Sequence, residues 1–397
     1  MEAPHLEAIR YRIYRCTGFG ICRGGYNSKV SPCPMQMGSP AGFEAETPRG
    51  IMTTARGILE GELDYSTELA EVVYRCTQCG NCRVLCGAVD LDTWRTLFDP
   101  GEVVLAMRTD LVERGLVPPR VRDYLKGMQV RGRPYLDVEN RRGQWARDLD
   151  LAAFSGHEYL LYAGDAGAFD ERGRRIAQAC ALVFQEAGLS FGVLGDEESA
   201  DGNEVLKSGE KWLFEKLAQE SIAAFRQRGV KRLIAFSPHA FNAFKNEYPA
   251  LGADLSVRHH SQVLAELLGQ KKLKFSRKIE ARVAFHDPCL LGRQNEEYEA
   301  PRQTLRALPG VELVEMPRAR ENALCCGGGG GNFFTDMSRG IDSPARRRLR
   351  EARDVRADVL AVACPKCAKM LEDASKLENL DGRIRIMDLA EIVQSVL

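Results

Sequence analysis

The chain has 397 residues, of which 44% are hydrophobic, and its 55 basic side chains are balanced by 55 acidic ones. This length predicts two or three domains with sizeable cores. The balanced charge excludes a protein whose main task is to bind nucleic acid or anionic lipid. No apolar run approaches about 18 residues and residues 1–15 lack a signal-peptide core, so the sequence predicts a cytoplasmic protein without a membrane span.

Thirteen cysteines dominate the sequence. Twelve of them fall into tight groups, seven in residues 1–100 and five in residues 281–397. Such groups serve metals better than disulfides, which are concentrated in small secreted domains. The thirteenth, Cys180, lies in a segment with Ile176 and Val183 at helical spacing, so it is predicted to be a core residue.

Residues 1–130 are predicted to form an α-helical module of the ferredoxin type, with an amphipathic helix at 101–115. Its main motif has the spacing C-x2-C-x2-C-x3-C and consists of Cys76, Cys79, Cys82 and Cys86. In this spacing three thiolates hold one cubane cluster, and the fourth serves the other cluster of a two-cluster ferredoxin. The alternative is a zinc site, but zinc favours two separated pairs of cysteines.

An internal repeat supports the ferredoxin interpretation. Residues 14–23 match residues 74–83 at seven of ten positions, with Phe19 where Cys79 stands. A further cysteine precedes a proline, as the last cysteine of a ferredoxin motif does. The crossed ligation of the ferredoxin pattern then assigns four ligands to one [4Fe–4S] cluster: Cys33, Cys76, Cys79 and Cys82.

The second site of this module is one thiolate short. Its ligands are Cys16, Cys22 and Cys86, because the side chain of Phe19 cannot bind iron. Three outcomes are open: a [3Fe–4S] cluster, a [4Fe–4S] cluster with a non-cysteine ligand, or an empty, vestigial site.

The remainder of the chain predicts two α/β halves. Residues 131–154 are rich in Arg and Gly and are expected to form a linker or a packed surface arm. Short apolar strands then alternate with helices, which predicts parallel βαβ layers in residues 155–265 and 266–397. Strands are expected at 159–163, 190–194, 232–236, 281–285, 311–315 and 359–363, and helices at 172–187 and 210–228.

The second cysteine group lies just after predicted strands or in loops, where the carboxyl ends of a parallel sheet present ligands to a crevice. Its members are Cys289, Cys325, Cys326, Cys364 and Cys367. Adjacent cysteines point in different directions, so such a pair can hold two irons. Gly327 and Gly328 allow positive φ and can donate backbone N–H groups to cluster sulfur. Lys366, between two of the cysteines, can raise the cluster potential or can be a solvated lysine.

The motifs HDPC at 286–289, CCGGGGG at 325–331 and CPKC at 364–367 resemble the cysteine-rich CCG domain of the heterodisulfide reductase catalytic subunit. The same domain occurs in the iron–sulfur subunits of glycolate oxidase and anaerobic glycerol-3-phosphate dehydrogenase. The resemblance covers nearly the whole chain, because the family places a two-cluster ferredoxin module before two CCG halves. It implies an α+β multidomain protein whose five later cysteines hold a non-cubane [4Fe–4S] cluster.

By the same resemblance, the half at 155–265 has lost its ligands. Ala200 and Asp201 stand at the family's paired cysteines, and Ser237 and Ala240 replace the cysteines of a Cys-Pro-His-Cys segment. This half is therefore expected to be a scaffold without metal. Ordinary surface or hydrogen-bonding roles are expected for three polar residues of its crevice, Asp165, Asp201 and His239.

Several other residues carry open alternatives. His286 is expected either to donate a proton beside the cluster or to hydrogen-bond a cluster sulfur or a backbone carbonyl. Four arginines either form a docking surface for an acidic partner or solvate the module: Arg15, Arg23, Arg75 and Arg83. Neither glycine group has a complete nucleotide fingerprint, so we expect no flavin or nicotinamide on this chain alone.

Two main functions follow from the sequence. In the first, the chain relays single electrons inside a larger complex whose other subunits carry flavin, molybdenum or tungsten. In the second, it cleaves a (hetero)disulfide at the non-cubane cluster, or serves a hydroxyacid or glycerol-phosphate dehydrogenase as its iron–sulfur subunit. The reductase pairs two non-cubane clusters, so the loss of one favours electron relay. A colourless, zinc-rich protein would indicate a third, structural class. The ligands do not set the direction of electron flow, because cluster potentials span about a volt.

Overall fold

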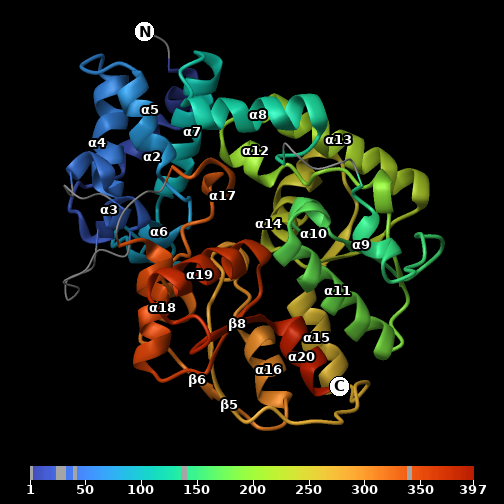
Figure 1. The fold of residues 1–397 in the computed structure, drawn as a ribbon. Coiled ribbons are helices and arrows are strands. Elements are labelled where there is room, and N and C mark those ends of the chain that lie inside the picture. Colours follow the sequence, from blue (N-terminus) through green and yellow to red (C-terminus); the bar gives the residue numbers. More distant parts are fainter. Residues whose placement is uncertain (1–2, 24–32, 39–42, 136–140, 338–341) are drawn as a thin grey trace.

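The N-terminal region of the chain is helical. The computed structural model describes residues 3–23, 33–38, 43–135, 141–337 and 342–397, and it places this region beside two α/β halves (Figure 1). The described helices of the region are α1 (Pro4–Ala8), α2 (Arg10–Tyr14), α3 (Pro34–Gly38), α4 (Pro48–Leu59), α5 (Thr67–Tyr74), α6 (Asn81–Leu85), α7 (Pro100–Glu113) and α8 (Pro119–Arg131).

Side-chain caps fix where three of these helices begin. Thr47 accepts a hydrogen bond from the Gly50 amide at the start of α4, and Ser66 accepts one from Leu69 at the start of α5. Asp99 caps α7, the helix predicted at 101–115. Each cap satisfies an amide that has no partner within the helix.

The first α/β half contains a four-stranded parallel sheet in the order β2-β1-β3-β4. Its strands are β1 (Tyr159–Tyr162), β2 (Phe191–Gly192), β3 (Arg232–Ala235) and β4 (Ser256–His259). Its helices are α10 (Gly164–Phe169), α11 (Glu171–Glu186), α12 (Asn203–Lys207), α13 (Lys211–Arg228), α14 (Pro238–Asn242) and α15 (His260–Gly269). A short helix, α9 (Gln144–Arg147), precedes this half.

The second half repeats this topology, with a parallel sheet in the order β6-β5-β7-β8. Its strands are β5 (Ala281–Phe285), β6 (Val311–Val314), β7 (Val359–Val362) and β8 (Arg385–Asp388). Its helices are α16 (Glu299–Ala307), α17 (Asn332–Thr335), α18 (Pro344–Asp354), α19 (Pro365–Leu377) and α20 (Leu389–Val396). The two predicted α/β halves are therefore confirmed.

The halves share one hydrophobic core. All four residues of β1 and of β7 are buried, as expected for strands covered on both faces. Helix α11 of the first half packs against α19 and α20 of the second, and α15 packs against α16 and α20. Cys180, on α11, has no exposed surface, in agreement with its predicted core position.

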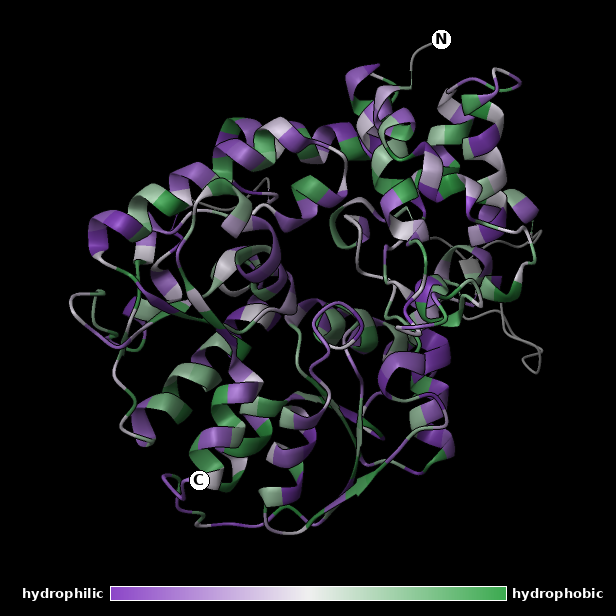
Figure 2. Cartoon of the chain, turned by 180° about the vertical axis from the view of Figure 1, so that it is seen from behind, coloured by the Kyte–Doolittle hydropathy of each residue, from purple (hydrophilic) through white to green (hydrophobic). Residues whose placement is uncertain are grey.

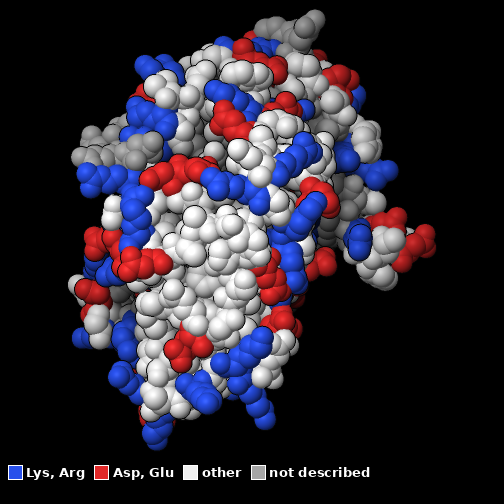
Figure 3. Space-filling view, turned by 90° about the vertical axis from the view of Figure 1, so that its right-hand side faces the viewer, with Lys and Arg blue, Asp and Glu red and all other residues white. Residues whose placement is uncertain are grey.

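The surface carries charges of both signs. Figure 2 shows hydrophilic and hydrophobic residues alternating along most helices, as expected where one helix face lies in the core. On the face shown in Figure 3, acidic and basic side chains are interspersed around an uncharged area, without a large region of one sign. Among the described residues, no helix combines the length and apolar character needed to cross a membrane.

Two details differ from the sequence prediction. The strand expected at 190–194 is only Phe191–Gly192, and the edge strands β4 and β8 were not predicted. For residues 131–154, the described part favours the packed arm of the two predicted alternatives, because it includes α9, whose Trp145 is 2% exposed against the first half. Trp145 anchors this arm because burying a large aromatic ring is strongly favourable.

Candidate metal centres

Five cysteine side chains converge at the carboxyl ends of β5 and β7. Cys289 follows β5 and Cys364 follows β7, where it is the N-cap of α19 and places Cys367 in the first turn. Cys325 and Cys326 come from the loop between β6 and α17. Four of the five are buried, and Cys289 is half-buried. We call these five residues the CCG cysteine set.

The thiols of this set lie in contact with one another. Cys367 Sγ lies 3.2 Å from Cys326 Sγ, and the Gly327 amide donates to Cys325 Sγ over 3.2 Å. Hydrogen bonds from Cys325 and Cys367 hold the pKa of Cys326 well below its usual range. Burial raises the pKa of Cys364, but hydrogen bonds from Cys367 and His239 outweigh it and bring that pKa to about 5. Such a set of thiols and thiolates releases its remaining protons when it binds a soft metal.

His286 lies beside the CCG cysteine set. Its ligand atom and those of Cys326 and Cys367 lie within 4.8 Å of one another, and the side chain is 1% exposed. Arg348 Nε donates to His286 Nδ1 over 3.2 Å. A proton on this ring therefore belongs on Nε2, which is buried, and a hydrogen bond from His286 helps to hold the pKa of Cys326 low. This tautomer suits a hydrogen bond to sulfur bound in the cysteine set.

Four further cysteines line one small pocket in the N-terminal region: Cys33, Cys76, Cys79 and Cys82. Cys76 follows α5, Gly80 turns the chain with φ of 74°, and Cys82 lies on α6. Burial raises the pKa of Cys76 to about 11. The pocket is otherwise mostly apolar, so the geometry brings together the four residues that the crossed pattern assigned to one cluster.

A second hollow in this region is lined by Cys16, Cys22 and Cys86 together with Phe19. All three thiols are half-buried, and burial together with the neighbouring Cys86 raises the pKa of Cys22 to about 11. Thr17 is the only polar, non-cysteine side chain among the described residues that line the hollow. The site therefore offers three thiols and no carboxylate or imidazole.

The two larger cysteine sets touch each other. A hydrogen bond with Cys325 lowers the pKa of Cys79 to about 5, and Thr77 Oγ1 lies 3.6 Å from Cys325 Sγ. Arg293, which is buried, donates to the Cys79 carbonyl over 2.7 Å and to the Ala323 carbonyl over 2.7 Å. A cluster in one set would thus lie directly beside a cluster in the other.

The glycine run explains how the two sets come so close. A Cβ on Gly329 would lie 2.6 Å from the Thr77 carbonyl oxygen, and one on Gly330 would lie 2.7 Å from that of Cys76. Any larger residue at either position would push the two cysteine loops apart. Gly327, with φ of 91°, additionally donates its amide to Cys325.

The crevice of the first half contains no thiol among its described residues. Ala200 and Ala240 are buried at the expected positions, and Asp201 caps the Asn203 amide over 2.9 Å. Asp165 forms an ion pair with Arg142 at 2.6 Å, and His239 Nδ1 lies 2.5 Å from Glu204 Oε1. These three polar residues therefore have the hydrogen-bonding roles expected, and Glu204 is a partner that sequence reasoning missed.

The four arginines proposed for docking are mostly engaged within the chain. Arg23 pairs with Glu44, Arg75 with Glu46 and Arg83 with Asp99. Arg15 lies over the ring of Tyr11, with its Cζ 5.7 Å from the ring centroid.

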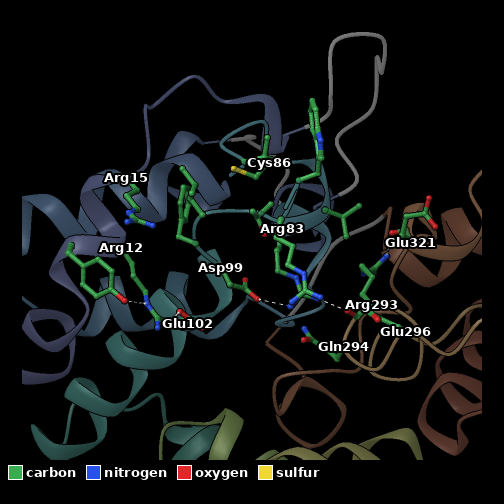
Figure 4. Close-up of a pocket in the computed structure, with 18 of the residues that line it drawn as sticks. Arg12, Arg15, Arg83, Cys86, Asp99, Glu102, Arg293, Gln294, Glu296 and Glu321 are labelled. Atoms are coloured by element: carbon green, nitrogen blue, oxygen red, sulfur yellow. Dashed lines mark hydrogen bonds and ion pairs between the residues drawn. The ribbon is translucent and has the colours of Figure 1, made fainter. Parts of the chain in front are cut away.

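A groove of about 890 Å³ runs beside the three-thiol hollow. Figure 4 shows Cys86 at this groove, with Arg15 and Arg12 on one wall and Arg293 and Glu321, from the second half, on the opposite side. The groove therefore gives solvent and partners access to a thiol of the second N-terminal site.

Comparisons with known proteins match the cysteine-rich part of the chain and most of its length. A family model described as a cysteine-rich CCG domain matches residues 283–372. The chain is 33% identical over 353 residues to the probable iron–sulfur-binding oxidoreductase FadF of Bacillus subtilis, which covers 84% of this chain and 49% of that protein. It is 30% identical over 350 residues to the EtfAB:quinone oxidoreductase of Syntrophomonas wolfei, covering 84% of this chain and 48% of that protein.

A third relative matches over most of its own length. The chain is 30% identical over 341 residues to a subunit of the dihydromethanophenazine:CoB–CoM heterodisulfide reductase of Methanosarcina mazei, covering 83% of this chain and 79% of that protein. It spans only about half the length of the two relatives above. A crystal structure of a hypothetical protein from Helicobacter pylori shares the fold, with a TM-score of 0.56 and 12% identity over 98% of this chain and 71% of that one.

Proposed function

Because the chain belongs to the iron–sulfur family of this heterodisulfide reductase subunit, we propose that it relays single electrons between iron–sulfur clusters inside a multi-subunit oxidoreductase. The observation that carries this proposal is the 3.6 Å contact of Thr77 Oγ1, between Cys76 and Cys79, with Cys325 Sγ, which joins the N-terminal cysteines to the CCG cysteine set. Clusters bound there supply one-electron chemistry. The protein's own residues hold them close together and exclude water.

The donor chemistry fits iron–sulfur clusters better than zinc. Structural zinc takes four ligands, whereas five thiols meet in the CCG cysteine set and three in the hollow of Cys16, Cys22 and Cys86. In this proposal the N-terminal set holds a [4Fe–4S] cubane and the CCG cysteine set holds the non-cubane [4Fe–4S] cluster. Gly327 and His286 donate hydrogen bonds to sulfur, and Lys366 adds positive charge nearby. Cysteine groups that bind metal suit the reducing cytoplasm, where thiols stay available as ligands.

Electron relay is favoured over disulfide cleavage as the task of the CCG cysteine set. Splitting a disulfide consumes two electrons and two protons, and two facing clusters would each take one sulfur. Ala200, Asp201, Ser237 and Ala240 leave the crevice of the facing half without a thiol among its described residues. Cleavage of a (hetero)disulfide at the one remaining cluster is the second candidate, favoured by the partial exposure of Cys289.

The groove beside Cys86 is the proposed entry or exit point for electrons. It reaches the three-thiol site, which is the part of the relay most open to solvent. The relatives are named as oxidoreductases, which supports a redox subunit as the partner, one that carries flavin, molybdenum or tungsten. The partner would place its redox centre against this groove.

Anaerobically purified protein should contain iron and acid-labile sulfide in near-equal amounts and should be brown, with broad absorbance near about 400 nm. Metal analysis together with sulfide determination measures this directly. Zinc in place of iron, in a colourless preparation, would refute the relay. The reference is the same protein after its iron has been removed by a chelator, which should lose both the colour and the sulfide.

A Phe19→Cys variant should complete the three-thiol site. The internal repeat places Phe19 where Cys79 stands, and Phe19 lines the same hollow as the three thiols. We expect the variant to carry a four-iron cluster there, with about one more iron per chain if the natural site holds three irons. Electron paramagnetic resonance should show loss of any oxidised three-iron signal. Phe19→Ser is the control, and it should leave the signal unchanged.

A further inference from the structure

Glu204 is a buried carboxylate of the first half that contacts the cysteine loops of the second. It lies on α12, directly after the loop that carries Ala200 and Asp201, and it is 5% exposed. Its Oε2 accepts a hydrogen bond from the Gly331 amide over 2.6 Å. That amide ends the glycine run that follows Cys326. A residue of the ligand-free half thus reaches into the CCG loop.

The other carboxylate oxygen meets corresponding residues of both halves. His239 is the third residue of the segment 237–240 after β3, and Lys366 is the third residue of the CPKC motif after β7. His239 Nδ1 lies 2.5 Å from Glu204 Oε1, and Lys366 Nζ lies 3.2 Å from the same oxygen. One carboxylate therefore stands between two positions that the repeated topology makes equivalent.

These contacts connect Glu204 to two segments that carry the cysteine set. The Gly331 contact constrains the loop of Cys325 and Cys326, and the Lys366 contact constrains the start of α19. His239 also hydrogen-bonds Cys364. Since Lys366 is 6% exposed, its charge requires a buried partner, and Glu204 is that partner.

We propose that Glu204 is a positioning residue for the CCG cysteine set, which aligns its loops and lowers the reduction potential of the cluster by offsetting the charge of Lys366. This inference rests on the proposed function, because it requires a cluster in that set. The potential of an iron–sulfur cluster depends on nearby charge and on hydrogen bonds to its sulfur. In a buried site this effect of charge is large, because the surroundings screen it weakly.

The test compares Glu204→Gln with Glu198→Gln in a redox titration followed by electron paramagnetic resonance. Glutamine keeps the shape and an acceptor oxygen but removes the charge. At a fixed solution potential, we expect the ratio of reduced to oxidised CCG cluster to rise about tenfold in Glu204→Gln, a shift of about 59 mV for one electron. Glu198 is the matched control: it is equally buried in the same half, but its bonds go to the Ala163 and Gly164 amides.

Lys366→Met makes the test independent of any folding defect in Glu204→Gln. Removing the positive charge should lower the same ratio, and the double variant should return near the wild-type value. The inference is overturned if Glu204→Gln titrates like wild type, if Glu198→Gln shifts the ratio equally, or if Lys366→Met does not lower it. A wild-type protein without iron would instead refute the proposed function, so the two failures are distinguishable.

Discussion

A Cys326→Ser protein should lose the cluster of the CCG cysteine set and keep the cubane of the N-terminal region. Cys326 Sγ lies 3.2 Å from Cys367 Sγ, and hydrogen bonds from Cys325 and Cys367 stabilise its thiolate. A serine hydroxyl is a poor, harder ligand for iron. We expect the loss of about four iron atoms per chain, together with the resonance signal of that cluster. Electron passage should fall by at least about a hundredfold, because changes outside the ligand shell already cost 10–100-fold.

Cys180→Ser provides the matched control for this substitution. Cys180 is also fully buried, but it lies on α11, outside the three cysteine sites. Its replacement should leave the iron content and all resonance signals unchanged. Iron analysis and resonance spectra of the two variants, both prepared without oxygen, test whether Cys326 is a cluster ligand and Cys180 is not. If Cys326→Ser retained all its iron, or if Cys180→Ser lost the same four, the assignment of ligands would be incorrect.

The centre of each sheet and the edge strand β6 were predictable, whereas the edge strands β4 and β8 were not. The strands β1, β3, β5 and β7 are short apolar runs that precede helices, and such runs are visible in a single sequence. The edge strands β4 and β8 read SVRH and RIMD, with few apolar residues. They form because each pairs along its backbone with a buried neighbour, β3 or β7. That support comes from tertiary contact and leaves little trace in local sequence.

The structure brings together the cysteines that the sequence grouped, whereas the contact between two of these groups was not predictable. Spacing within a motif reports which thiols can share a metal, so Cys33 could be grouped with Cys76 through the repeat. Nothing in either motif indicates that Cys79 meets Cys325, which lies far along the chain. The glycine run has both roles expected of it, because the Gly327 amide donates to Cys325 Sγ and other glycines allow close backbone approach. Gly329 and Gly330 lack side chains chiefly because the carbonyls of Thr77 and Cys76 press against them.

Buried charged residues are the class that sequence reasoning missed. Charged side chains are expected outside, and Glu204 and Arg293 stand in segments with ordinary patterns. The one signal that the sequence offers is a charged residue at a helix position whose neighbours face the core. Arg108 lies between Met107 and Leu111 on α7, so it falls among the residues of a core-facing helix.

Arg108 joins the three parts of the molecule through backbone carbonyls. Its guanidinium has no exposed surface, and it donates to the carbonyls of Lys207 in the first half and Gly330 in the second, over 2.7 and 2.8 Å. It also donates to the carbonyl of Cys76 over 2.6 Å and to those of Val73 and Tyr74, at the end of α5. A cation there satisfies carbonyls that the helix leaves unpaired and complements its dipole.

Arg108→Met should therefore destabilise the whole chain by about 3–5 kcal/mol, because five carbonyls, three of them in buried hydrogen bonds, lose a charged donor that methionine cannot replace. The melting temperature, followed by circular dichroism of cluster-loaded protein, should fall by roughly 10 °C. The control is Arg114→Met, because Arg114 follows the last turn of α7, the helix that carries Arg108. Arg114 pairs with Asp64 at 3.2 Å near the surface, and its loss should cost less than about 1 kcal/mol. Equal melting temperatures for Arg108→Met and Arg114→Met would show that Arg108 does not join the three parts. The melting temperature of Arg108→Lys should lie between those of the two variants, because one ammonium group cannot reach the carbonyls on both sides at once.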